Sequence, residues 1–158
     1  MALARRGWPH GAVARGWPHG PVARGPPHGR YGGRVDGDDD LAARLRAICL
    51  TLPEVTERPS HGVPAWFVRG KKSFAQLWAD GHHADHFPHL WCAGLPGAQG
   101  ELTAASPGRF FRPPYVGHRG WIGARLDGDV DWTELAELCA DAYRAVAPAK
   151  LAALLDAR

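Results

Sequence analysis

A nine-residue repeat near the start of the chain limits how much of it can fold. Residues 6–32 read RGWPHGAVA, RGWPHGPVA and RGPPHGRYG, with Arg, Gly, Pro, His and Gly at fixed places. Each unit holds at least three Gly or Pro residues and only one or two large apolar side chains. Burial of so few apolar groups cannot offset the conformational entropy lost on ordering the segment. We therefore predict a disordered basic tail over residues 1–35 and one folded domain over residues 36–158.

The repeat itself has three interpretations. Arg and Trp on a flexible chain can hold single-stranded nucleic acid by charge and stacking. Regularly spaced His can hold a transition metal loosely. The interpretation that we favour is a recently duplicated stretch, or coding sequence upstream of the true start, since Gly-rich DNA repeats read in frame produce such a sequence.

The net charge of +3 conceals an uneven distribution. Residues 1–35 contain six Arg and no acidic residue, whereas residues 36–158 contain 13 Lys or Arg against 16 Asp or Glu. The pI of about 9.0 therefore belongs to the tail, and it is no argument that the domain binds nucleic acid. Within the domain, residues 58–125 carry eight Lys or Arg against three Asp or Glu, so the central segment is basic and its flanks are acidic.

The sequence argues against several classes of protein. No apolar run approaches the roughly 18 residues of a membrane-spanning helix, so we expect no membrane partner. Cys49, Cys92 and Cys139 are spaced by 43 and 47 residues, which fits no zinc or redox motif, and we interpret them as reduced core thiols of a cytoplasmic protein. No catalytic motif and no cofactor motif is present, so we expect neither catalytic residues nor a cofactor.

Apolar spacing in the domain predicts helices and strands that do not alternate as βαβ units. Leu41, Leu45, Ile48 and Leu52 form a helical stripe that ends at Pro53. The other expected helices cover 96–105 and 132–147, and the expected strands cover 63–69, 73–79, 89–95, 110–116 and 120–127. This order predicts an α+β fold, with an antiparallel β-sheet covered by helices in two layers.

Two local signals refine this prediction. Asp131 followed by Glu134 three positions later fits a capping arrangement at the start of the last helix. Prolines within the segment 110–116 place that strand at an edge or a bend of the sheet.

Three stretches resemble the MmcQ/YjbR family when they are taken together and in this order. They are LPEVTERPSHGVPAWFVRGKKSFAQL, RFFRPPYVGHRGWIGARLD and DWTELAELCADAYRAVAPAKL, and with the first helix they span residues 41–151. The resemblance implies a double-wing fold similar to that of the bacterial frataxin-like (CyaY-like) proteins. It also implies DNA binding, the label that members of the family commonly carry. The repeat tail departs from the family, whose members normally begin near the first helix.

Basic turns between the expected strands are the candidate nucleic-acid interface. The turn Gly70-Lys71-Lys72 and the turn around Arg119 are the candidate wing tips, and phosphate contacts require only Lys or Arg on a reachable ridge. The candidate nucleic-acid-binding residues are Arg69, Lys71, Lys72, Arg112 and Arg119. The alternative is that these residues are solvated hairpin turns without a ligand.

A loop rich in histidine is the other candidate site. Residues 81–89 read GHHADHFPH, with four imidazoles and one carboxylate. Imidazole and carboxylate ligate zinc, nickel or copper, so His82, His83, Asp85 and His86 are candidate metal ligands. If the loop folds back over the sheet, we expect a small-molecule or metal site at which His82, His83, Asp85 and His118 converge. If the loop projects into water, we expect a solvated polar loop.

Overall fold

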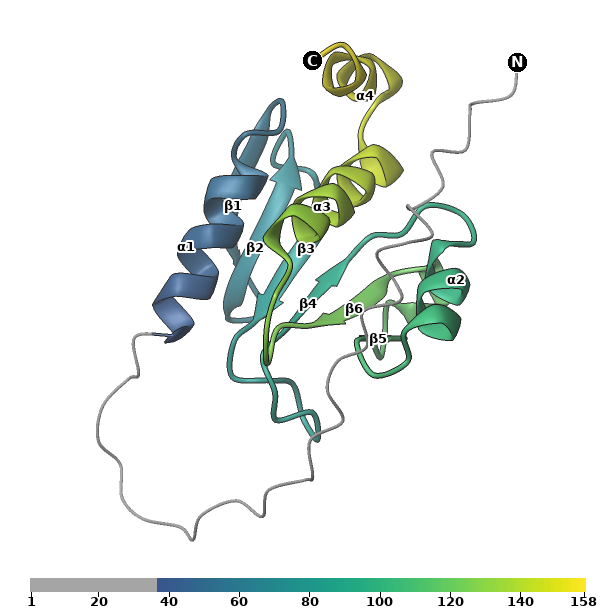
Figure 1. Ribbon diagram of the computed structural model, residues 1–158. Coiled ribbons are helices and arrows are strands. Elements are labelled where there is room, and N and C mark those ends of the chain that lie inside the picture. Colours follow the sequence, from purple (N-terminus) through teal and green to yellow (C-terminus); the bar gives the residue numbers. More distant parts are fainter. Residues whose placement is uncertain (1–36) are drawn as a thin grey trace, which may run out of the picture. The chain divides into compact units, whose positions relative to one another are not determined.

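Six strands form one antiparallel sheet in the computed structural model, which describes residues 37–158 (Figure 1). The predicted tail and its repeats lie outside the described residues. The helices are α1 (Gly37–Cys49), α2 (Ala98–Ala105), α3 (Trp132–Val146) and α4 (Ala149–Asp156), with a 3-10 turn, η1 (Gly117–Arg119). The strands are β1 (Val55–Ser60), β2 (Val63–Val68), β3 (Lys72–Trp78), β4 (His89–Cys92), β5 (Phe110–Phe111) and β6 (Ile122–Arg125).

The sheet has the strand order β1-β2-β3-β4-β6-β5, and every neighbouring pair is antiparallel. The first four strands follow one another as hairpins, and the return through α2 and β5 places β6 beside β4. This confirms the predicted α+β fold with an antiparallel sheet.

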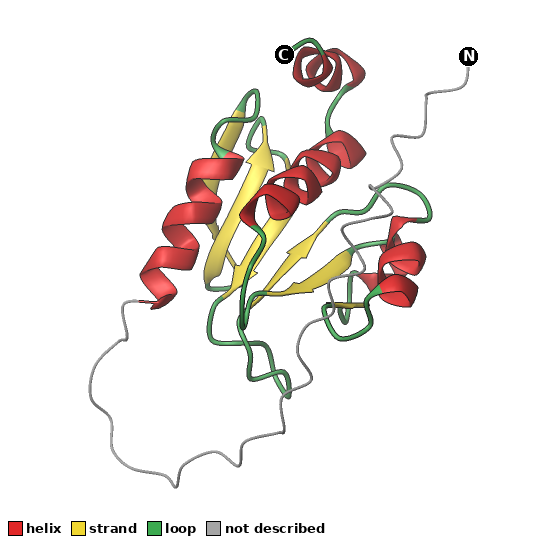
Figure 2. Ribbon diagram, viewed as in Figure 1, coloured by secondary structure: helices red, strands yellow, loops and turns green. Residues whose placement is uncertain are grey.

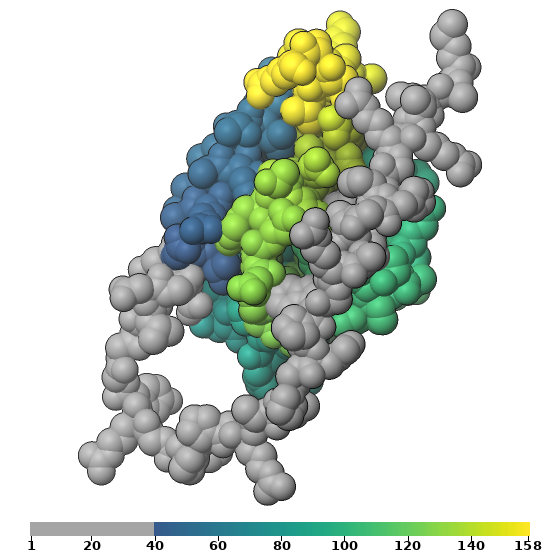
Figure 3. Space-filling view, in the orientation of Figure 1, coloured from purple at the N-terminus to yellow at the C-terminus, as the bar shows by residue number. Residues whose placement is uncertain are grey.

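Helices α1 and α3 lie side by side over one face of the sheet (Figures 2 and 3). Leu77 pairs with Leu90 across the β3–β4 ladder, and cross-strand partners share a face. On this helix-covered face Phe74 meets Tyr143 of α3 with ring centroids 5.8 Å apart. The Tyr143 hydroxyl donates to the Pro53 carbonyl at 2.8 Å, which ties α3 to the connection between α1 and β1. The apolar core therefore lies between the helices and this face.

The predicted cap of the last helix is confirmed in part. Asp131 Oδ1 accepts hydrogen bonds from the backbone N–H groups of Thr133 and Glu134, both at 3.1 Å. The Glu134 carboxylate does not return to Asp131, because it pairs with Arg109 at the start of β5. The helix is thus capped at one position and joined to the sheet edge at the other.

Two strand predictions differ from the structure. The strand β1 was missed, because VTERPS contains a proline and four charged or hydroxyl side chains and shows no apolar alternation. The expected strand 110–116 is reduced to Phe110–Phe111, because Pro113 and Pro114 cannot donate ladder hydrogen bonds. The strand lies at the edge of the sheet, as its prolines predicted.

None of the helices within residues 37–158 has both the length and the apolar character needed to cross a membrane.

Candidate functional site

The strand register gives the sheet two ends with different charged residues. At the first end, β2 stops at Val68, β3 starts at Lys72 and β6 starts at Ile122. We call it the basic end, because the turn 69–71, Lys72, the residue after β5 and the turn η1 bring Arg69, Lys71, Lys72, Arg112 and Arg119 to it. At the opposite end, β3 stops at Trp78 and β6 stops at Arg125. We call it the acidic end, because the loops that leave it carry Asp80, Asp85, Asp127, Asp129 and Asp131.

Four of the five candidate nucleic-acid-binding residues are exposed and form no ion pair within residues 40–158. They are Lys71, Lys72, Arg112 and Arg119. The fifth, Arg69, pairs with Glu54, which raises the pKa of Arg69 and lowers the pKa of Glu54 through their hydrogen bond. The basic end therefore offers four side chains for an external anion, and Arg69 is already neutralised.

Arginines at the acidic end are bound to carboxylates of the same chain. Arg109 pairs with Glu134, and both side chains are mostly buried. Arg125 donates to Asp127 through Nε at 2.9 Å and Nη2 at 2.6 Å, and this hydrogen bonding lowers the pKa of Asp127. These guanidinium groups stabilise the fold and are not available to a ligand.

The histidine loop folds back over the sheet at the acidic end. His82 and Asp85 close a tight turn through two backbone hydrogen bonds of 2.9 and 3.0 Å. The His82 ring lies 4.0 Å from the ring of His83, and the hydroxyl of Tyr115 lies 3.4 Å from His83 Nε2. His86 is exposed, and His118 lies in η1 near the other end of the sheet.

Residues of the described range contain no group of three or more His, Cys, Asp or Glu side chains arranged to hold a metal ion. The loop thus brings His82 and His83 together without a third ligand. The side chains of the sheet that the loop contacts through His82 are aromatic.

We call the side of the sheet opposite α3 the aromatic face, defined by Trp78, His89, Trp91 and Phe111. The register places them together, because Trp78 pairs with His89 on the neighbouring strand while Trp91 and Phe111 both pair with Gly123. The Trp78 and Trp91 rings lie 4.7 Å apart, and His89 stacks on Trp91 at 6.0 Å. The sequence signal for this face was the alternation His89-x-Trp91, because side chains two apart in a strand point the same way.

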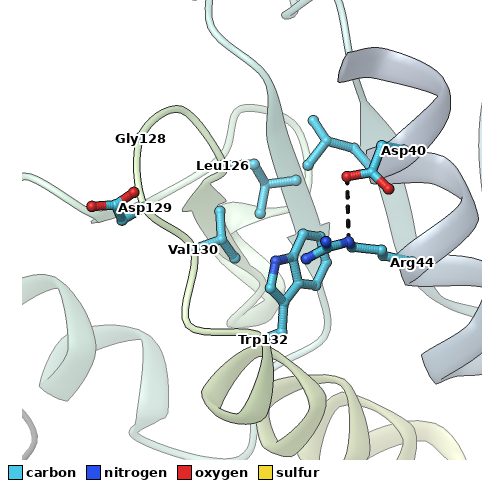
Figure 4. Close-up of a pocket in the computed structure, with 8 residues that line it drawn as sticks. Asp40, Arg44, Leu126, Gly128, Asp129, Val130 and Trp132 are labelled. Carbon is cyan, nitrogen blue, oxygen red and sulfur yellow. Dashed lines mark ion pairs between the residues drawn. The ribbon is translucent and has the colours of Figure 1, made fainter. Parts of the chain in front are cut away.

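A shallow cavity of about 370 Å³ lies between the start of α1 and the loop that precedes α3 (Figure 4). Trp132 forms one wall, and the Arg44 guanidinium lies 4.9 Å from the centre of its ring. Asp40 pairs with Arg44 at 3.3 Å, as the dashed line in Figure 4 shows. Arg44, the cation in the lining of this cavity, therefore already has a carboxylate and an aromatic partner in the chain.

The three cysteines converge in the core, a proximity that their spacing did not predict. All three are free and buried, and Cys49 and Cys139 contribute from α1 and α3. The hydrogen bond with Cys139, followed by burial, raises the pKa of Cys49 well above its usual value, and burial does the same for Cys92. Thiols held in the neutral form are poor nucleophiles, which agrees with a structural role.

Comparisons with known proteins give the family. A model of the YjbR family matches residues 50–145, more than half of the chain, so the chain belongs to the YjbR family. A crystal structure of the Deinococcus radiodurans protein DR2400, described as a DUF419 domain, is similar in fold with a TM-score of 0.57 and 19% identity. The match covers 73% of this chain and 87% of that one. No curated protein matches the chain.

Proposed function

We propose that this protein binds nucleic acid weakly and largely without sequence preference through its basic end. The observation that carries the proposal is the group of four exposed cations, Lys71, Lys72, Arg112 and Arg119, without an ion-pair partner in residues 40–158. Free Lys and Arg side chains are what phosphate contacts require, and such contacts carry no sequence information. The DNA-binding label of the family whose sequence pattern the chain resembles agrees with this.

The basic and acidic residues lie at opposite ends of the strands, and this separation supports binding of the polyanion at one end only. Asp80, Asp85 and Asp129 lie at the acidic end without an ion pair among the described side chains. A phosphate backbone is attracted to one end of the sheet and repelled from the other. The contact is therefore expected to be confined to the turns that carry Lys71 and Arg119.

The test compares variants of equal charge change on a fragment of residues 36–158, which lies within a compact unit with its own core. Removing the tail is necessary, because six Arg on it bind any polyanion. In gel shifts with short duplex DNA at low salt, Lys71→Gln/Lys72→Gln and Arg112→Gln/Arg119→Gln should each weaken binding about tenfold, or about 1.4 kcal/mol. Arg44→Gln/Arg125→Gln, which removes two paired cations, is the matched control and should bind like the unaltered fragment. Equal weakening by all three pairs would sink the proposal.

The second candidate function is a small-molecule or metal-binding module at the 82–89 loop. The observation that favours it is the packing of His82 against the aromatic face, with its ring 4.4 Å from that of Trp78. Zinc titration of the same fragment distinguishes a metal site from a small-molecule site. Stoichiometric micromolar binding that is lost in His82→Ala/His83→Ala would support the metal form, and weak binding typical of a surface His pair would leave the small-molecule form.

A further inference from the structure

Three buried polar atoms on the aromatic face have no hydrogen-bond partner in the part of the chain that the structure describes. They are Trp78 Nε1, Trp91 Nε1 and His89 Nε2. The exposed fractions of these side chains are 9%, 3% and 0%, so bulk solvent does not reach them. Trp66, buried on the helix-covered face, shows the usual outcome, since its Nε1 donates to Glu57 at 3.2 Å. Buried polar groups are nearly always paired, so three exceptions in one cluster indicate a partner from outside residues 37–158.

The three atoms form a set with defined hydrogen-bonding character. His89 Nδ1 lies 2.8 Å from the Phe87 carbonyl, which can only accept, so Nδ1 carries the proton. Burial lowers the pKa of His89, so the ring is neutral and its Nε2 is an acceptor. The two indole nitrogens are donors only. A partner that satisfies the set must therefore carry acceptors and at least one donor.

The His82 imidazole occupies the notch between the two indoles. Its ring centroid lies 4.4 Å from that of Trp78 and 4.7 Å from that of Trp91. The indole planes are tilted by 46° to each other, and the flat His82 ring meets both of them edge to face, at interplanar angles of 77° and 60°. Its hydrogen-bonding groups nevertheless stay unpaired, because no hydrogen bond joins His82 to either indole within residues 40–158. The chain's own ring thus fits the shape of the notch but not its chemistry.

The turn that carries His82 is closed by its own hydrogen bonds and is not part of a strand ladder of the sheet. Gly81 has φ of 82°, and a Cβ at this position would overlap the Asp85 carbonyl, so only glycine fits at the start of the turn. The turn 82–85 is closed by its own two backbone hydrogen bonds. Outside the notch, His82 and His83 meet the ring of Tyr115, whose side chain is 70% exposed. The turn can leave the notch as one piece without breaking a strand ladder.

We propose that the aromatic face binds a planar nitrogen heterocycle of the nucleobase class in the notch between Trp78 and Trp91, with His82 as the lid. The heterocycle's ring nitrogens and carbonyl groups accept from the two indole N–H groups, and its N–H donates to His89 Nε2. The ring stacks on the indoles as bases stack on aromatic side chains in general. This inference rests on the second candidate function and is independent of phosphate binding at the basic end.

Other ligands fit the notch less well. A metal ion lacks its ligands, because no group of three candidate side chains exists in the described range. An organic cation suits indole faces but brings no acceptor for the indole N–H groups. A sugar supplies donors and acceptors but no flat ring. A heterocycle supplies the acceptors, the donor and the flat ring together.

The test follows the indole N–H resonances of Trp78 and Trp91 in nitrogen–proton correlation spectra of the full chain, assigned with Trp78→Phe and Trp91→Phe. The probes are adenosine, guanosine, cytidine and uridine, with ribose as the ring-free control. We expect saturable shifts of both resonances with at least one nucleoside and none with ribose. His82→Ala removes the competing ring and should tighten binding about tenfold, because the open notch is then always available.

Two comparisons keep the test decisive. Lys71→Gln/Lys72→Gln should bind the nucleosides like the unaltered chain, since a nucleoside carries no phosphate. His86→Ala, which removes an exposed imidazole of the same loop, is the matched control for His82→Ala and should leave the affinity unchanged. Absence of saturable shifts up to about 10 mM in both the unaltered chain and His82→Ala overturns the proposal. Equal shifts with ribose overturn it as well.

Discussion

The two ends of the sheet differ in how their cations are paired within the chain, with Arg69, which pairs with Glu54, as the exception at the basic end. At the acidic end, Arg109 and Arg125 each hold a carboxylate of the same chain, and at the basic end Lys71, Lys72 and Arg119 hold none within residues 40–158. A count of charges along the sequence makes all five equal contributors to a basic central segment. The comparison teaches that the available charge is what remains after internal pairing. Cations at the acidic end should therefore matter for stability, and those at the basic end for binding.

The largest expected effect is the loss of Arg109. Arg109→Ala leaves the Glu134 carboxylate, 19% exposed, without its partner, and the free energy of unfolding should fall by about 2–3 kcal/mol. This lies below the roughly 3–5 kcal/mol of fully buried pairs, because the first turn of α3 stabilises a negative charge. Urea unfolding measures it. Arg109→Ala/Glu134→Gln should recover part of the loss, and a single variant as stable as the unaltered chain would contradict the comparison.

The next largest effect is expected on the pH dependence of the free energy of unfolding, through His89 at the acidic end. Burial lowers the pKa of His89 from its ordinary value of 6.5, so the unfolded chain binds this proton more readily than the folded chain. The contribution of the neutral His89 ring to the free energy of unfolding is therefore complete above about pH 6.5 and is lost as the pH falls through the lowered pKa. Urea midpoints between about pH 7.5 and pH 5 should fall more in the unaltered chain than in His89→Gln. The exposed His86→Gln is the control and should keep the full fall.

A smaller effect is expected at the exposed pair of the acidic end. Hydrogen bonding from Arg125 lowers the pKa of Asp127 below its ordinary value of 3.8, so the pair stabilises the fold above that pH and less below it. Both side chains are 38% exposed, and solvent screens them. Asp127→Asn should lower the free energy of unfolding by only about 0.5 kcal/mol near neutral pH. A loss as large as that of Arg109→Ala would show that exposure does not rank these pairs.

The smallest effect is expected at the basic end. Lys71→Gln/Lys72→Gln removes two exposed charges without a partner, and the free energy of unfolding should change by less than about 0.5 kcal/mol. Thermal and urea unfolding of the fragment 36–158 measure this. Marked destabilisation would mean that these lysines hold the β2–β3 turn and are not free for a ligand.

Local signals predicted much of the fold, and pairings between distant segments could not be predicted. The helical stripe at Leu41 and Leu45 and the turn at Gly70 are local patterns, and α1 and the β2–β3 hairpin follow from them. The pairing of Arg109 with Glu134 depends on where α3 crosses the sheet edge, which no spacing encodes.

The candidate site divides in the same way. Lys71 and Lys72 could be found from their turn alone, whereas the meeting of Trp78 with His89 depends on the β3–β4 register. A register shift by one residue moves every side chain to the other face. The histidine loop was visible in the sequence, but its aromatic partners became defined only when the strands were paired.

Salt dependence tests the central claim, that the unpaired cations of the basic end bind nucleic acid. The logarithm of the affinity for duplex DNA is measured against the logarithm of salt concentration for the fragment 36–158 and for Lys71→Gln/Lys72→Gln. Each phosphate contact contributes about 0.9 to the slope, so the variant's slope should be shallower by about 1.8. An unchanged slope, or no salt-dependent binding of the unaltered fragment at low ionic strength, would contradict the account.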